Sequence, residues 1–222
     1  MKKLVFGIVA TVLLANLSFG QDLNKFIPAD MYGTYHNELL QIYFEKYNSG
    51  KDKDIKVLYY QMLEEFEKLH PNVVSDEEKK FYENRLNEVF GSNTKFSEIN
   101  FNEIYNKAAR KYYAPALQDF FIDILKRNDS PEVTNEKISI LKEDKTLTPN
   151  DLNEITKFES IYKSSEIFWK DRLPNTNVSN RCNPHHQILL ADAFGLFMGG
   201  WTSLLLSAAV QESIDQHGGN CI

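Results

Sequence analysis

The sequence of 222 residues predicts an all-α protein, on three observations. Apolar residues recur every three or four positions from residue 23 to residue 172, which is the spacing of one helix face. Stretches that alternate apolar and polar residues, as half-buried strands do, are scarce. Residues that start and stop helices, such as Ser75 and Pro115, interrupt the pattern. We therefore expect a multi-helix body.

The N-terminus has the pattern of a secretory signal peptide over residues 1–20. Lys2 and Lys3 form a short basic region, and the uncharged run Leu4 to Ala15 is too short for an ordinary membrane helix. Small side chains precede the expected cleavage after Gly20. The short lengths are typical of bacterial export, which predicts a periplasmic or extracellular protein.

The charge of the expected mature chain argues against one class of partner. Cleavage after Gly20 would remove two lysines and no acid, so the formal net charge would change from −6 to −8. Phosphate backbones are bound by basic surfaces. We therefore expect no nucleic-acid partner.

Residues 21–173 are expected to form the helical body. Its first well-defined stripe of apolar residues on one helix face lies in the N-terminal third. This stripe consists of Ile55, Leu58, Tyr59, Met62, Phe66 and Leu69. His70 and Pro71 end this helix. Ser75 to Glu78 then form a capping box, in which each of the two side chains would accept a hydrogen bond from a backbone N–H of the first turn. The stripe that follows is Tyr82, Leu86, Val89 and Phe90, with Gly91 as the C-terminal cap.

Three further amphipathic helices are expected in the body. Pro115 separates the first two, and Thr148 and Pro149 begin the third as N-cap and first helical residue. Their apolar faces are, in order, Phe101, Ile104, Tyr105, Ala108 and Tyr112; Leu117, Phe120, Phe121, Ile124 and Leu125; and Leu152, Ile155, Phe158, Tyr162 and Trp169. We interpret these faces as core.

The body carries no motif of a common enzyme class. GxSxG, HExxH, the phosphate loop GxxxxGK[ST] and GxGxxG are all absent from the sequence. Adjacent carboxylates, Glu64 with Glu65 and Glu77 with Glu78, lie beside lysines and are expected to be solvated helix faces. We expect no cofactor and favour a protein that is not an enzyme.

A linker rich in Pro, Asn and Ser, residues 174–184, precedes an apolar segment at residues 185–222. Ala193 to Val210 is an uncharged run of 18 residues, long enough for a membrane-span candidate. Glu212 and Asp215 follow the run, whereas a stop-transfer helix would be followed by Lys or Arg. Burial in the body, contact with a partner protein and membrane insertion remain open.

Small residues recur at every fourth position of the apolar segment. If the segment is one helix, they form a stripe along which another backbone can approach closely, unless the alignment is due to chance: Ala191, Gly195, Gly199, Ser203 and Ser207. About 30 residues of this segment resemble the glycine-zipper tails of small secreted bacteriocin-like proteins. That resemblance implies a membrane-active or self-associating tail.

Cys182 and Cys221, the two cysteines of the chain, flank the apolar run, and in an oxidising compartment an isolated pair favours a disulfide. A straight helix between them would hold the two Cα atoms much farther apart than a disulfide allows. The chain would therefore fold back as a helical hairpin with its turn at Gly199 and Gly200. The disulfide and the unbroken small-residue stripe are competing predictions.

Histidines beside the cysteines allow a second chemistry. A zinc site would use the thiolates and imidazoles of Cys182, His185, His186, His217 and Cys221. Oxidation during export would remove the thiolates, and unpaired or intermolecular thiols are a further possibility. Asp192, the carboxylate next to the apolar run, is expected to interact with a helix dipole or to pair with His185 or His186 rather than to act in catalysis.

These observations predict an exported, non-enzymatic binding protein. Its apolar C-terminal segment would pack on the body, on an unknown partner protein or on a membrane surface, and self-association is possible. The alternatives are an exported metal-dependent enzyme using the Cys/His cluster, and a purely structural helical domain.

Overall fold

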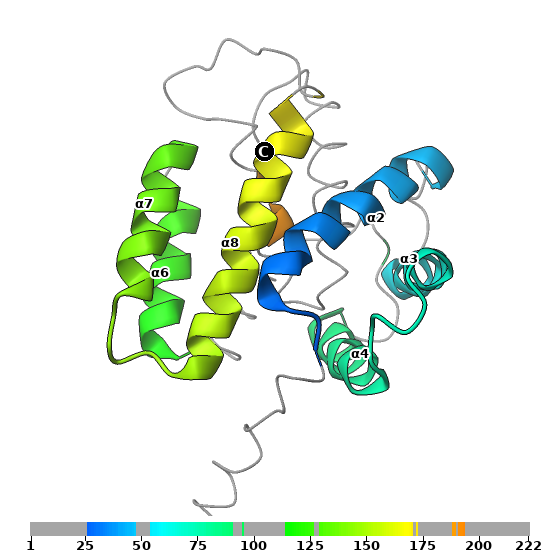
Figure 1. Cartoon of the computed structure of the whole chain (residues 1–222), viewed down its shortest axis with the longest axis horizontal. Helices are drawn as coiled ribbons and strands as arrows, with labels where there is room; N and C mark the ends of the chain where they lie inside the picture. The colour runs from blue at the N-terminus through cyan, green and yellow to red at the C-terminus, as the bar shows by residue number, and fades with distance from the viewer. Residues whose placement is uncertain are drawn as a thin grey trace, which may run out of the picture.

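A computed structural model describes residues 26–47, 54–90, 95, 114–126, 129–170, 172, 188–189 and 191–193. Within these residues the named elements are all helical, which confirms the expected all-α class. In the described part of the chain, an isolated bridge pairs Asp54 with Lys95. The elements are η2 (Ala29–Met31), α2 (Tyr32–Lys46), α3 (Ile55–Leu69), α4 (Asp76–Phe90), α6 (Pro115–Lys126), α7 (Pro131–Lys142) and α8 (Pro149–Lys170) (Figure 1).

Helix α8 is the centre of the arrangement. Helix α2 and η2 pack along one side of it, and α7 packs on the other. Figure 1 shows α6 beside α7, and α3 and α4 on the far side of α2. Helix α8 has neighbours on both sides, and its buried apolar side chains are Ile155, Phe158, Ile161, Tyr162, Phe168 and Trp169. The N-terminal and central parts of the chain are therefore joined through one long helix.

The α2–α8 contact combines a glycine with polar side chains. The Gly33 N–H donates to Ser160 Oγ over 2.9 Å, and that hydroxyl donates to the Asp30 carbonyl over 2.6 Å. Met31, the N-cap residue of α2, makes no capping hydrogen bond with its side chain. Ser160 of α8 therefore satisfies one of the free backbone N–H groups that every helix leaves in its first turn.

The predicted helix starts are confirmed at α4, α6 and α8. At α8, Asp151 N donates to Thr148 Oγ1 over 3.2 Å while Thr148 N donates to Asp151 Oδ2 over 2.9 Å. Helix α7 was not singled out from the sequence, although Ser130 caps it and Pro131 is its first residue. That is the same Ser/Thr-Pro start signal as at α8.

One residue of the apolar stripe predicted for α3 is exposed and not buried. Leu69 is 61% exposed at the last position of the helix, where the chain turns away through His70. The other five members of the stripe are buried. The stripe thus predicts the buried face correctly until the helix ends.

The described beginning of the apolar C-terminal segment lies in the body core. Ile188, Leu189, Ala191 and Ala193 are at most 1% exposed and belong to the same apolar cluster as the inner faces of α2, α3 and α8. The linker at residues 174–184 lies outside the described residues. Among the helices of the described part, none combines the length and the apolar character needed to cross a membrane.

Candidate functional site

Two groups of buried polar side chains stand out in the described core. The first is the Glu78 cluster, which we define as the buried residues Tyr32, Glu78, Tyr82 and Lys157 together with the partly buried Glu154. The second is the Asp192 contact, which consists of His36, Trp169 and Asp192. Buried charges must be paired or hydrogen-bonded, because transferring them from water costs several kcal/mol. Each group is therefore a place where the fold depends on specific partners.

The Glu78 side chain corrects two predictions. Its carboxylate is fully buried, with 0% exposure, so it is not a solvated helix face. Half of the capping box forms, because Glu78 N donates to Ser75 Oγ over 3.1 Å. The carboxylate instead accepts from the Ile27 N–H over 3.1 Å and from the hydroxyl of Tyr32. Glu78 thus connects the N-terminal segment and α2 to α4.

Lys157 of α8 supplies the positive charge of this cluster. It is 2% exposed, and its Nζ lies 3.0 Å from Glu154 Oε1. The ammonium also lies 4.9 Å from the ring centre of Tyr32 and 5.4 Å from that of Phe26, both within the range of a cation–π interaction. The aromatic rings and Glu154 together compensate for the burial of the lysine.

Burial changes the protonation chemistry of these groups. Removal from water raises the pKa of Glu78, and the bonds from Tyr32 and Ile27 and the charge of Lys157 offset this in part. Burial acts to lower the pKa of Lys157, but the negative charge of Glu154 and the neighbouring Tyr82 and Glu78 raise it above its ordinary value. Lys157 therefore stays charged at neutral pH, while Glu78 takes up a proton more readily than an exposed glutamate does.

The Asp192 contact ties the C-terminal segment to two helices. Trp169 Nε1 of α8 donates to Asp192 Oδ2 over 2.8 Å, and His36 Nε2 of α2 lies 3.2 Å from Asp192 Oδ1. Asp192 is 0% exposed and His36 is 1% exposed. Among the described residues, Trp169 hydrogen-bonds one oxygen of this carboxylate and His36 lies beside the other; His185 and His186, the expected partners, lie outside the described residues.

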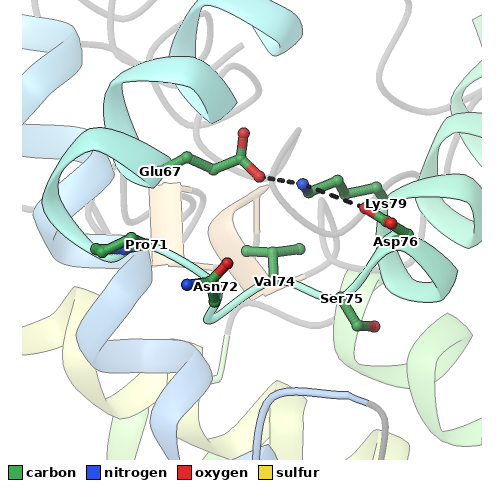
Figure 2. Close-up of a pocket in the computed structure, with 7 residues that line it drawn as sticks. All are labelled: Glu67, Pro71, Asn72, Val74, Ser75, Asp76 and Lys79. Carbon is green, nitrogen blue, oxygen red and sulfur yellow. Dashed lines mark ion pairs between the residues drawn. The ribbon is translucent and has the colours of Figure 1, made fainter.

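A polar hollow of about 430 Å³ lies at the turn between α3 and α4. Figure 2 shows the Lys79 ammonium directed toward two carboxylates, those of Glu67 and Asp76 (Figure 2). Asn72 takes a positive φ of 66° in this turn. The wall is formed by Glu67, Pro71, Asn72, Val74, Ser75, Asp76 and Lys79. Since the lysine is already neutralised, the hollow presents a polar and not a cationic surface.

Most site residues predicted from the sequence lie outside the described residues. These are Cys182, His185, His186, Gly195, Gly199, Gly200, Ser203, Ser207, His217 and Cys221. Ala191, the first member of the small-residue stripe, is described and is 1% exposed. In the part of the chain that the structure describes, no cluster of three or more His, Cys, Asp or Glu side chains is arranged to hold a metal.

Sequence reasoning missed His36 and Lys157 as partners of buried carboxylates. The available signal was weak: each is a polar residue at a helix position that the apolar spacing assigns to the core. His36 lies between Tyr32 and Leu39 or Leu40 on the buried face of α2, and Lys157 precedes Phe158 on α8.

The described chain thus belongs to the all-α class, with its buried charges used to join helices. Comparisons with protein-family models, with curated proteins and with solved structures each find no match.

Proposed function

We propose that the chain is an exported, non-enzymatic binding protein whose helical body anchors the start of an apolar C-terminal segment. The observation that carries this proposal is the Asp192 contact. The Asp192 carboxylate contacts α2 and α8, and residues 194–222 follow it closely in the sequence.

The composition beyond this anchor supports the proposed role. Residues 194–210 contain no charged side chain and carry Gly195, Gly199 and Ser203 at intervals of four. Such spacing permits close contact between helices, in lipid or with a partner protein. The likeness to glycine-zipper tails points in the same direction, and we therefore propose a membrane surface as the first target to test.

The test compares the chain from Gln21 to Ile222 with a chain that ends at Ala193. The shorter chain keeps Asp192 and the buried apolar residues before it, so its body should remain folded. Both are mixed with vesicles of phosphatidylcholine and phosphatidylglycerol and separated by flotation. We expect the long chain to float with the vesicles and the short chain to stay behind.

Two controls make the result decisive. Thermal melting followed by circular dichroism establishes that both chains are folded, and sedimentation without vesicles measures self-association. If neither chain floats, the membrane role is wrong. If the long chain alone forms oligomers and does not float, the segment acts in protein contact instead.

The proposed pairing of Cys182 with Cys221 belongs to the same hypothesis and can be tested separately. Intact mass of the exported protein should rise by about 2 Da on reduction if the thiols form a disulfide. An unchanged mass together with bound zinc would favour the metal site.

A further inference from the structure

Phe26 and Ile27, which we call the N-terminal latch, lie between α4 and α8. The Phe26 ring meets the Phe81 ring of α4 edge to face, with the two ring centres 5.5 Å apart. The Lys157 ammonium of α8 lies 5.4 Å from the centre of the same Phe26 ring. Ile27 is 3% exposed. One aromatic side chain of the latch therefore contacts both helices.

The backbone of the latch donates a hydrogen bond to α4. The Ile27 N–H donates to Glu78 Oε2 over 3.1 Å, and Glu78 is 0% exposed. A carboxylate that water does not reach needs donors inside the protein, and hydrogen bonds to a charged group contribute more than bonds between neutral groups. Loss of the Ile27 N–H would therefore leave this buried carboxylate with one donor fewer.

The two halves of α4 are held in different ways. In the first half the buried side chains are Glu78 and Tyr82, and the Tyr82 hydroxyl lies 3.0 Å from that of Tyr32 on α2. In the second half the described buried side chains are Leu86 and Phe90, whose burial needs no hydrogen-bond donor. Contacts between polar groups weaken once water enters, because water competes for the same donors and acceptors. The first half of α4 is thus the half that depends on the latch.

Helix α8 has other supports. Helix α2 and η2 pack along one side of it, and α7 packs on the other (Figure 1). These contacts include the bond from the Gly33 N–H to the Ser160 hydroxyl and the bond from the Lys142 ammonium to Glu159, which is 2.6 Å long. Neither bond involves the latch, so α8 should keep its place when the latch is released.

We infer that the N-terminal latch holds the first half of α4 against α8, and that its release lets residues 76–82 open as a local unit while α2, α7 and α8 stay folded. Such local opening needs less free energy than global unfolding and occurs where few apolar contacts are buried. Opening admits water to Glu78 and to the Tyr82 hydroxyl. The latch thereby controls access to the Glu78 cluster. This inference is independent of the role proposed for the C-terminal segment.

Amide hydrogen exchange of the full mature chain, read by mass spectrometry, tests the latch. Phe26→Ala removes the ring between Phe81 and Lys157 and leaves the backbone donor of Ile27 in place. We expect protection of residues 76–82 to fall about tenfold or more, and protection of residues 158–169 in α8 to change by less than about threefold.

Ile27→Pro is the second variant, because proline has no N–H to donate to Glu78. It tests the backbone bond of the latch in the full chain and should lower the protection of residues 76–82 in the same selective way. The control is Leu69→Ala, which shortens an apolar side chain that is 61% exposed at the end of α3. It should leave the protection of α4 and α8 as in wild type.

Circular dichroism establishes which variants are folded, and Phe26→Ala keeps the test valid if Ile27→Pro is not. A loss of protection confined to residues 76–82 supports the latch. Unchanged protection of these residues in the folded variants would show that α4 does not depend on it. An equal loss in α4 and α8 would also overturn the inference, because the N-terminal segment would then belong to one cooperative unit with both helices.

Discussion

Gly33 of α2 lies directly against the backbone of Ser160 in α8. A Cβ atom at residue 33 would stand 2.1 Å from the Ser160 carbonyl oxygen and 2.3 Å from Ser164 Oγ. The first of these is a backbone atom inside a long helix, which cannot rotate away. The two helices therefore approach more closely than any other residue at position 33 would permit.

Gly33→Ala should destabilise the fold despite the higher helix propensity of alanine. Overpacking against backbone costs about 1–3 kcal/mol, more than the roughly 1 kcal/mol gained from propensity. Urea unfolding followed by circular dichroism measures the change. The exposed neighbour Thr34→Ala should be neutral or slightly stabilising, and a Gly33→Ala variant as stable as wild type would show that α2 and α8 are not in this contact.

Ser160→Ala should weaken the α2–α8 junction through a lost cap. The change leaves the Gly33 N–H and the Asp30 carbonyl without their shared hydroxyl partner, at a cost of about 1–2 kcal/mol. The matched control is Ser139→Ala, where an exposed hydroxyl bonds within its own helix. We expect the control to change the free energy of unfolding by less than about 0.5 kcal/mol. Equal effects of the two changes would contradict a capping role for Ser160.

Glu78→Gln should alter how stability depends on pH. Because the pKa of Glu78 is raised in the folded state, the fold binds this proton more tightly than the unfolded chain does. Glu78 therefore contributes stability that grows as the pH falls and is lost as the pH rises through its folded pKa. Glutamine does not titrate. As the pH is lowered from neutral, the stability of wild type should therefore rise relative to that of Glu78→Gln.

Unfolding free energies of wild type and Glu78→Gln at a series of pH values measure this difference. Glu77→Gln removes a charge from the exposed neighbouring position of α4 and serves as the control. A constant difference between wild type and Glu78→Gln across the series would mean that the carboxylate does not titrate in the folded protein under these conditions.

Lys157→Met should be strongly destabilising at neutral pH. It leaves the buried carboxylate of Glu78 and the partly buried carboxylate of Glu154 without the ammonium with which both interact, and breaking a buried pair costs about 3–5 kcal/mol. The deficit should shrink on acidification, because protonation of Glu78 removes one of the two anions. Lys163→Met, which breaks a pair with Glu159 at a lysine that is 54% exposed, should change stability by less than about 1 kcal/mol. Similar losses for the two lysines would argue against a buried pair at Lys157.

The helix starts were predictable because their signals are local. Ser75, Ser130 and Thr148 each cap a helix within three residues of their own position, so neighbouring sequence contains the whole interaction. The spacing of apolar residues likewise predicted the buried face of α3 up to its last turn. These features do not depend on which helices become neighbours.

The partners of the buried charges were not predictable in this way. The pattern Ser75 to Glu78 satisfies the capping-box rule, yet the carboxylate accepts hydrogen bonds from Ile27 and Tyr32. Asp192 likewise lies against His36, which is distant in the sequence. A carboxylate brought into the core takes whichever donors the packed helices place beside it, because leaving it unpaired costs more than a surface cap contributes. The amino-acid sequence alone was enough to predict an all-α body and the starts of α4, α6 and α8. The choice of partners for Glu78 and Asp192, and of the aromatic rings beside Lys157, arose from long-range packing, since those contacts exist only once distant helices exclude water between them.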